Sequence, residues 1–437
     1  MGNYLSHNEE DIRIMLDKIG IESEEALYAA VPEGLMLKDL PDLPEGLSEM
    51  EVQKEMKKLA GKNKVYDTVL LGAGAYKHYI PAIVSEVIAK ERFLTAYTPY
   101  QAEISQGILQ SIFEYQTMIC ELTGMDVANA SVYDGASAAA EAAAMCRDRK
   151  RSRVLVSAAA HPDTIAVMKT YAWAAGSELT LIPEKDGVTD LEALDSLIDD
   201  KTAAVLIQQP NFFGLIEDAE KTGEIARASK AKFIMSVNPI SAALLKTPAE
   251  CGADIAVGEG QPLGMPLSFG GPYLGFMAAQ AGMMRKLPGR IVGETTDEQG
   301  RRAFVLTLQA REQHIKREKA GSNICSNEAL CAMAASVYMA AMGKEGVKQA
   351  AIQSASKAHY FAEELGKAGF ARAHAGEFFH EFVTKVPCGA DQALAALDDA
   401  GILGGLKLSE DEILWCVTEL VSKAELDLAV SVLKEVG

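Results

Sequence analysis

The strongest constraint on the fold is a series of seven short apolar runs that alternate with helical stretches between residues 126 and 278. The runs are DVANASVY, SRVLVSA, ELTLIP, AAVLIQQP, KFIMSVN, DIAVGE and YLGFMA. Several are apolar at nearly every position, which is typical of strands covered on both faces. Most are separated by segments long enough for a helical crossover, such as ASAAAEAAAMCRD and EKTGEIARASK. This alternation predicts an α/β layer fold with a mainly parallel sheet.

The pattern divides the 437 residues into three parts. Residues 1–62 are expected to form an N-terminal helical arm, because short amphipathic stretches alternate there with Pro-rich turns. Residues 63–320 hold the predicted strands and form a large α/β domain. After a long helical run, FFHEFVTKV and EILWCVTE are predicted as strands around the helix QALAALDDAG. Residues 321–437 are therefore predicted to form a smaller α+β domain.

Charge and hydropathy exclude two classes of partner. The chain has 42 Lys and Arg against 61 Asp and Glu, for a net charge of −19. Such a field repels phosphate backbones and anionic lipid surfaces. No stretch approaches the roughly 18 consecutive apolar residues of a membrane-spanning helix. We therefore expect no nucleic-acid partner and no membrane partner.

Cysteine and histidine usage favours a reduced cytoplasmic protein without a metal site. The seven cysteines include no C-x-x-C pair and no Cys/His cluster, which argues against both a disulfide framework and a zinc site. The seven histidines lack metal-ligand spacing, and no G-x-S-x-G motif accompanies them. The first twenty residues also lack the basic end and apolar core of a signal peptide. A hydrolase triad and a metallohydrolase are both disfavoured.

Three local motifs have competing interpretations. His161 directly follows the run SRVLVSA, where α/β folds place ligand-facing residues, although a hydrogen-bonded structural histidine is equally compatible. GAGAY at 72–76 lacks the third glycine of a dinucleotide fingerprint and is predicted to be a loop. RDRKRSR at 147–153 follows an Ala-rich helix, whose negative end it would complement as a solvated cap.

Two segments have an unusual composition. FLTAYTPYQAEISQG at 93–107 places two tyrosines beside a proline, which makes a rigid polar surface suited to a ligand or another subunit. GEGQPLGMPLSFGGPYLGF at 258–276 holds six glycines and three prolines in 19 residues. That density lets the backbone approach a cofactor, a ligand or a partner chain closely.

These segments carry a resemblance to a known family. TAYTPYQAEISQG, ASVYDGASAAAEAAAMC, QQPNFFG, GADIAVGEGQPLGMPLSFGGP and LTLQAREQHIKREKAGSNICSNEAL together resemble the glycine decarboxylase P-proteins of the glycine cleavage system. The similarity runs over nearly the whole chain. It is greatest to the N-terminal half of these proteins, which forms a separate subunit in many bacteria.

The resemblance implies a fold, a reaction and a set of partners. The family has the fold-type I architecture of pyridoxal-phosphate enzymes, in which a seven-stranded, mainly parallel sheet precedes a small C-terminal domain. The implied reaction is the decarboxylation of glycine, followed by transfer of the aminomethyl group to the lipoyl group of the H-protein. The implied partners are a second P-protein subunit, the lipoylated H-protein and glycine.

The sequence departs from the family's catalytic pattern at two positions. Gln261 falls nearest the place of the lysine that holds the cofactor, and no Lys lies between Lys246 and Lys286. Met235 falls where an Asp should keep the pyridine nitrogen protonated. The phosphate cradle remains as Gly135, Ala136 and Ser137 at the start of the Ala-rich helix, although an empty helix N-cap explains these residues equally well.

The departures predict a subunit that binds no cofactor covalently and completes the site of a homologous partner that carries the lysine. Tyr97, Tyr100 and Gln101 are the predicted catalytic residues, and Thr98 and His161 are predicted to lie at the substrate or the interface. Two alternatives stay open. The chain could be a self-sufficient enzyme that uses Lys246 or Lys286, or a structural or regulatory subunit that contributes no side chain to the chemistry.

Overall fold

The computed structural model describes residues 7–37, 42–99 and 101–437. These residues form two compact units with a boundary between Val65 and Tyr66. The first unit contains α1 (Glu9–Ile19) and α2 (Glu49–Ala60), and each begins with a reciprocal capping box, at Asn8 and Ser48. Among the described residues between them, the 3-10 helices η1 (Glu24–Tyr28) and η2 (Glu33–Leu35) form, both without a side-chain cap. Neither α1 nor α2 buries a described residue.

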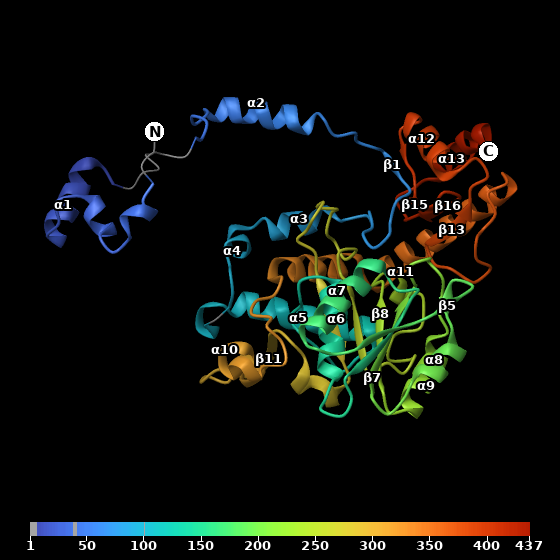
Figure 1. Ribbon diagram of the computed structural model, residues 1–437, viewed down its shortest axis with the longest axis horizontal. Coiled ribbons are helices and arrows are strands. Elements are labelled where there is room, and N and C mark those ends of the chain that lie inside the picture. Colours follow the sequence, from blue (N-terminus) through green and yellow to red (C-terminus); the bar gives the residue numbers. More distant parts are fainter. Residues whose placement is uncertain (1–6, 38–41, 100) are drawn as a thin grey trace. The chain divides into compact units, whose positions relative to one another are not determined.

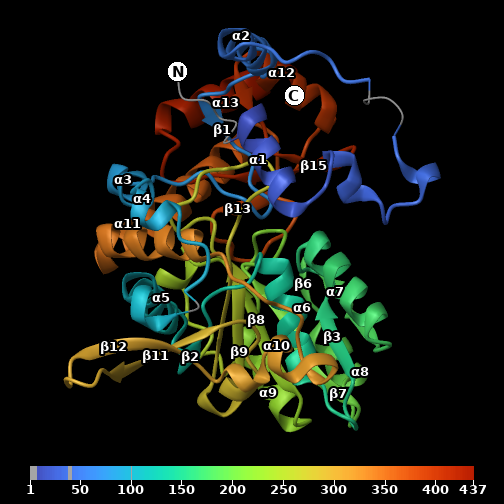
Figure 2. The same ribbon diagram turned by 90° about the vertical axis from the view of Figure 1, so that its left-hand side faces the viewer.

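The second unit is built around a central sheet that contains seven strands among the described residues (Figures 1 and 2). In spatial order they are β2 (Val127–Ala128), β10 (Gly275–Ala279), β9 (Ile255–Glu259), β8 (Lys232–Val237), β7 (Thr202–Gln209), β3 (Arg153–Ser157) and β4 (Leu179–Ile182). Each of the seven predicted apolar runs overlaps one of these strands, so the predicted α/β fold is confirmed. The sheet is mixed, which corrects the expectation of a mainly parallel sheet, because β10 is antiparallel to both of its neighbours.

Helices cover both faces of this sheet. The helices α6 (Gly135–Cys146) and α7 (Pro162–Ala174) pack on one face, and α5 (Gln106–Thr123), α8 (Leu191–Leu197), α9 (Ala219–Ala228) and α11 (Ala329–Lys367) pack on the other. Figure 2 shows α5 and α11 on one side of the strands and α7 on the opposite side. Because side chains alternate along a strand, Val205 and Ile207 face one core while Ala204 and Leu206 face the other. This double burial explains why the runs are continuously apolar.

A second, antiparallel sheet follows α11. Its strand order is β13 (Glu381–Lys385), β16 (Glu412–Cys416), β15 (Leu406–Ser409). The same C-terminal region contains the helices α12 (Ala390–Asp399) and α13 (Lys423–Val436). Beside it, β1 (Thr68–Val69) pairs in parallel with β14 (Ile402–Leu403). Residues near 70 therefore belong to the layer formed by the C-terminal residues. Residues 66–437 form one compact unit, and the division into large and small domains at 320 stays a prediction.

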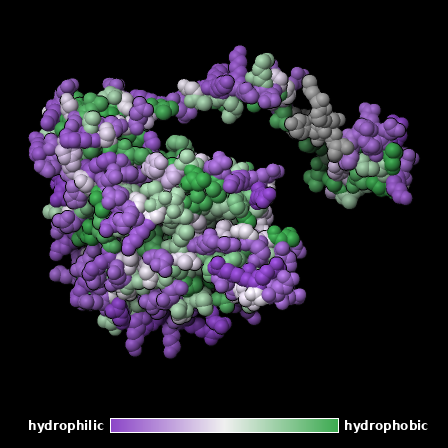
Figure 3. Space-filling model, turned by 180° about the vertical axis from the view of Figure 1, so that it is seen from behind, coloured by the Kyte–Doolittle hydropathy of each residue, from purple (hydrophilic) through white to green (hydrophobic). Residues whose placement is uncertain are grey.

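The remaining elements connect these layers. They are α3 (Ala82–Ile88), α4 (Glu91–Leu94), α10 (Gln313–Lys316), η3 (Ala102–Ile104), η4 (Ser241–Ala243), η5 (Ala281–Lys286), η6 (Gln309–Arg311), η7 (Arg317–Lys319), the pair β5 (Glu184–Lys185) and β6 (Val188–Thr189), and the hairpin β11 (Ile291–Thr296) and β12 (Arg302–Thr307). Within the described ranges, no helix is both long and apolar enough to cross a bilayer. On one face of the second unit, apolar side chains gather among charged ones (Figure 3).

Candidate functional site

A cleft of about 340 Å³ opens at the carboxyl ends of the parallel strands. Its lining comes from residues 73–76, the start of α6, and the residues that follow β3, β7 and β8. The chain order reverses between β3 and β7, because β4 lies on the other side of β3. Ligands of open α/β sheets bind outside such a switch point. The position therefore marks this cleft as the place where a cofactor of this fold would bind.

The N-terminus of α6 lines the cleft, but the chain's own carboxylates already use its N–H groups. Asp134 caps the helix and accepts the N–H of Ser137 at 2.7 Å. Glu259 Oε2 accepts the N–H of Gly135 at 3.0 Å, and its Oε1 accepts the N–H groups of Gln261 at 2.9 Å and Leu274 at 3.0 Å. Of the predicted cradle, Gly135 and Ala136 line the cleft and Ser137 does not.

Gln261, at the predicted lysine position, is buried and serves a structural role. Its Oε1 accepts the N–H of Tyr76 at 2.8 Å, and its Nε2 donates to the carbonyls of Tyr76 at 2.9 Å and Met265 at 2.7 Å. A side chain with these three hydrogen bonds fixes the loop at 73–76 against the glycine-rich segment. The amide has no nucleophilic nitrogen to offer a carbonyl group.

The structure corrects the residue expected at the end of β8. Met235 is fully buried in the core between the sheet and α11, so its side chain does not reach the cleft. Asn238 lines the cleft instead. Its Oδ1 accepts the N–H groups of Ile240 at 2.9 Å and Ser241 at 3.2 Å, whereas its buried Nδ2 has no partner among the described residues. An amide donor, not a carboxylate, therefore faces the cleft from this strand.

His161 lines the cleft as the N-cap residue of α7. Its Nε2 donates to the carbonyl of Ala73 at 2.9 Å, while its Nδ1 accepts the N–H of Asp163 at 3.1 Å. This pair of contacts fixes the neutral tautomer with the proton on Nε2. The ring packs edge-on against Phe212 at a centroid distance of 5.1 Å. His161 therefore lines the cleft and also has a structural role, and its contact with a ligand stays a prediction.

Buried titratable groups form another wall of the cleft. Glu381 accepts the N–H of Ala73 at 2.6 Å and the hydroxyl of Tyr76 at 2.7 Å. Burial raises the pKa of Glu381 to about 7. The neighbouring His380 has no partner for either ring nitrogen within the described part of the chain, and burial lowers its pKa well below the usual value.

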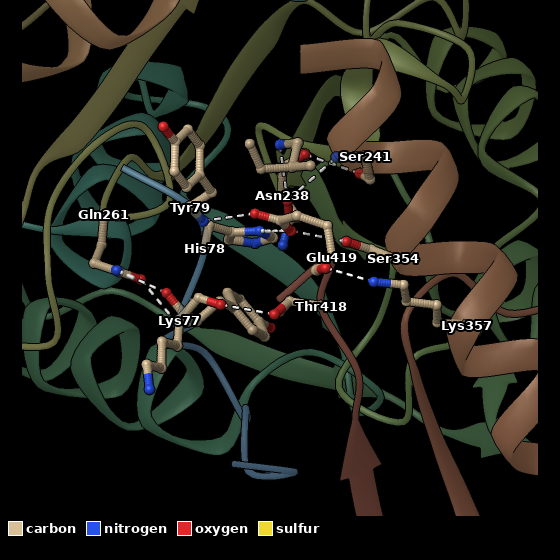
Figure 4. Close-up of polar contacts among 12 residues, drawn as sticks. Lys77, His78, Tyr79, Asn238, Ser241, Gln261, Ser354, Lys357, Thr418 and Glu419 are labelled. Carbon is tan, nitrogen blue, oxygen red and sulfur yellow. Dashed lines mark hydrogen bonds and ion pairs between the residues drawn. The ribbon is translucent and has the colours of Figure 1, made fainter. Parts of the chain in front are cut away.

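A second buried carboxylate fixes the loop that carries these contacts. Figure 4 shows Glu419 between His78 and α11. Its Oε2 lies 2.7 Å from Nδ1 of His78 and accepts from Ser354 at 3.2 Å, while its Oε1 accepts the N–H of Tyr79 at 2.6 Å. Burial opposes ionisation, but the hydrogen bond and charge of His78 lower the pKa of Glu419. The cleft wall at 73–79 is thereby tied to the layer after β16.

The predicted aromatic segment does not line the cleft. Tyr97 is 77% exposed, Thr98 is half-buried and Gln101 is exposed, where it precedes η3. Tyr100 lies outside the described residues. The structure thus brings Gly135, Ala136 and His161 together and places Tyr97, Thr98 and Gln101 elsewhere on the surface.

Sequence reasoning gave no functional role to several residues that line the cleft, among them Glu259, Asn238, His380 and Glu381. Glu259 lies in the glycine-rich segment at 258–276. Asn238 had a readable signal, because it ends the run KFIMSVN, and cleft-facing residues follow the last strand residue. His380 and Glu381 had none, because they come from a distant sheet that tertiary packing brings to the cleft.

Comparison with known proteins decides the family. A family model described as "Glycine cleavage system P-protein" matches residues 2–433. The chain belongs to the glycine cleavage system P-protein family. It is 52% identical to the probable glycine dehydrogenase (decarboxylating) subunit 1 of Carboxydothermus hydrogenoformans, with 98% of this chain and 99% of that protein covered. Identity to the protein of the same name from Desulfitobacterium hafniense is 50%, with 99% and 100% covered.

Solved structures confirm the fold of the P-protein family. The crystal structure of a glycine decarboxylase (P-protein), determined in inhibitor-bound form, superposes with a TM-score of 0.94 at 42% identity, and both chains are covered completely. A sphingosine-1-phosphate lyase from Burkholderia pseudomallei superposes with a TM-score of 0.68 at 16% identity over 94% of each chain, which shows a shared fold alone. The predicted fold-type I architecture is confirmed.

The cleft of this P-protein chain does not fit pyridoxal phosphate. The N–H of Gly135, which a phosphate would need, already binds Glu259, and the described lining holds four carboxylates but no Lys or Arg. A phosphate dianion there would face Asp134 and Glu259 at close range. Neither of the alternative lysines lines this cleft. Lys246 forms an exposed ion pair with Glu220 at 2.6 Å, and Lys286 lines a different cavity.

We predict that Glu381 makes the stability of the chain depend on pH. Its folded pKa of about 7 lies above the ordinary 4.5, so only the folded state keeps the proton between these values. Stability therefore falls as pH rises through that window, by about 3 kcal/mol for this group. Glu381→Gln retains an acceptor for Ala73 but cannot ionise, so it should lack this slope.

Denaturant unfolding at about pH 5 and about pH 8 measures the effect as the difference between wild type and variant. Glu377→Gln, at an exposed neighbouring carboxylate, is the matched control and should keep the wild-type slope. Identical pH dependence in wild type and Glu381→Gln would show that the buried carboxyl titrates normally.

We further predict that the purified chain does not bind pyridoxal phosphate covalently. After incubation with the cofactor and borohydride reduction, mass spectrometry should find no specific pyridoxyl-lysine, because no lysine is among the described lining residues. A chain of the same fold that has its cofactor lysine serves as the positive control. A stoichiometric adduct on one lysine would contradict the prediction.

Proposed function

We propose that this chain is the subunit of a two-chain glycine decarboxylase that does not hold the cofactor. Together with a homologous second P-protein subunit, it decarboxylates glycine and passes the aminomethyl group to the lipoyl group of the H-protein. The partner binds pyridoxal phosphate through its lysine, and this chain completes the partner's site. The enzyme works in the cytoplasm. The observation that carries the proposal is the Glu259 carboxylate on the N-terminus of α6, in a chain that the P-protein family model matches over residues 2–433.

The cleft supports a division of labour between two chains. The relatives from C. hydrogenoformans and D. hafniense are both named as subunit 1. In this chain Gln261 falls at the position of the cofactor lysine, and its amide forms hydrogen bonds with the backbone of Tyr76 and Met265. A complete decarboxylase therefore needs its electron-withdrawing cofactor on another polypeptide. A P-protein fold without a cofactor site fits a chain that assembles with a partner and completes the partner's site.

Exposed apolar side chains support assembly. Among the described residues of the range 79–104, five large apolar side chains are exposed, namely Tyr79, Ile83, Leu94, Tyr97 and Ile104. The helices α1 and α2 of the first unit bury no described residue, although each carries apolar side chains such as Ile14 and Met50. Large exposed apolar patches mark interaction sites in soluble proteins. A second P-protein subunit would cover them.

The segment around Tyr97 is the proposed contribution to the partner's site. Tyr97 presents a phenol at the surface, and the nearby buried Pro99 restricts its own backbone and that of the preceding Thr98. A phenol is a hydrogen-bond donor that suits a substrate carboxylate, and the Gln101 amide can donate and accept. Held by an interface, these groups would orient glycine and shape the opening through which the lipoyl arm enters.

Assembly predicts how the two subunits behave in solution. Mixed in equal amounts, the chain and the second P-protein subunit should elute together from a size-exclusion column, because each covers the other's apolar surface. Glycine–bicarbonate exchange should require both chains. Two separate stable species that each elute alone would contradict the heteromer, and exchange by this chain alone would favour the self-sufficient alternative.

Substitutions in the aromatic segment separate a shared site from mere packing. Tyr97→Phe removes one hydrogen-bond donor, and loss of such a donor commonly lowers turnover by roughly tenfold to a thousandfold. We expect this loss, and a similar one for Gln101→Ala, at a saturating concentration of the partner and with assembly unchanged. Tyr79→Phe, at another exposed tyrosine, is the matched control. Normal exchange in both variants would leave only a structural role for the segment.

A further inference from the structure

A second cavity of about 200 Å³ lies at the opposite end of α6 from the cleft. The cleft contacts Gly135 at the start of this helix, whereas the second cavity contacts Glu141 and Arg147 near its end. The 12 residues of α6 span about 18 Å. Residues 285–289 also line the cavity, and they follow β10, whose last residue Ala279 pairs with the first residue of β9. The two cavities share no lining residue.

Basic side chains from four elements converge on this cavity, although the chain as a whole has a charge of −19. Arg147 follows α6, Arg285 and Lys286 end η5, Arg311 ends η6 and Lys316 ends α10. Two carboxylates, Glu141 and Glu312, line the same cavity as these five basic side chains. The local excess of positive charge is therefore opposite in sign to the charge of the whole molecule.

Two of the guanidinium groups have buried donors that no described residue satisfies. Arg311 donates through Nη1 to the carbonyl of Leu287, but its buried Nε and Nη2 have no hydrogen-bond partner. Arg147 donates through Nη1 to Ser177 at 2.5 Å, and its buried Nε has none. Burial lowers the pKa of both side chains, as expected where desolvation exceeds the attraction of nearby carboxylates. Unpaired buried donors of this kind call for an acceptor.

The two carboxylates do not supply that acceptor. Glu312 Oε2 lies 3.7 Å from Nη1 of Arg290 and 3.8 Å from Nδ1 of His314, both of which are ion-pair distances. Within the described residues, the Glu312 carboxylate forms no hydrogen bond with Arg311. Burial raises the pKa of Glu141, although its hydrogen bond with Ser322 and the charge of Arg147 act in the opposite direction. Water could accept the N–H groups, but it would leave the charge of the guanidinium groups uncompensated in a confined space.

We propose that this cavity binds a small oxyanion with at least two negative charges, of the phosphate class. Guanidinium groups match the geometry of phosphate oxygens, and lysines add charge at the rim. The volume suits a phosphate group or a small phosphate ester. A bound anion would link α6 to the segments at 285–289 and 311–324, and so would stabilise the fold at a distance from the cleft.

Calorimetric titration of the full chain with inorganic phosphate, at constant ionic strength set by chloride, tests the site. We expect one saturable site per chain. Arg311→Gln should weaken binding about tenfold or more. Because that substitution touches a buried group, the double variant Arg285→Gln and Lys286→Gln changes only exposed rim residues and should weaken binding comparably. Lys434→Gln, at an exposed lysine of α13, should leave it within about twofold.

A protection experiment locates the anion. Phosphate should slow acetylation of Lys286, measured by mass spectrometry, and should leave acetylation of Lys434 unchanged. Titration with glycerol 3-phosphate distinguishes two sources of the same group, since tighter binding favours a phosphate ester and equal binding favours free phosphate. Absence of saturable binding, or binding that survives both Arg311→Gln and the rim double variant, would overturn the proposal.

Discussion

The carboxylate of Glu259 holds together the region in which cofactors of this fold bind. It accepts N–H groups from the first residue of α6, from the loop after β9 and from Leu274 just before β10. A Cβ at position 135 would lie 2.8 Å from the backbone nitrogen of Glu259, so only glycine permits this approach. An internal anion therefore takes the position at the helix N-terminus that favours phosphate. Burial raises the pKa of Glu259, while its three N–H donors act in the opposite direction.

The rest of the cleft is consistent with this internal anion. Gln261 connects the glycine-rich segment to Tyr76, and Glu381 connects Tyr76 and Ala73 to the second sheet. The side chains that would carry out chemistry in a self-sufficient enzyme thus serve as structural connections. On the proposed function, a P-protein chain with such a cleft keeps the fold of the family and leaves the cofactor to its partner. Its contribution to glycine decarboxylation would then come from groups it presents outward, such as Tyr97.

Strands that are buried on both faces could be predicted from the sequence alone. Strands β3, β7 and β8 are apolar on both faces because helices cover both sides of the sheet, and this pattern could be read directly. The strand β15 could not, because its four half-buried residues give no comparable signal. The resemblance to the family placed Met235 where a cofactor-binding Asp is expected, whereas the alternation of side chains along β8 directs Met235 into the core. His380 and Glu381 reach the cleft only through the packing of the second sheet, which no local pattern encodes.

We propose that this chain supplies side chains to a cofactor site on its partner. A crystal structure of the two-subunit complex with glycine, or with an analogue of glycine, tests this proposal most directly through the position of Tyr97. We expect the Tyr97 hydroxyl within hydrogen-bonding distance, about 3 Å, of the substrate or of the cofactor held by the partner's lysine. A Tyr97 hydroxyl that faces solvent, or that bonds only to interface residues remote from the cofactor, would overturn the proposal.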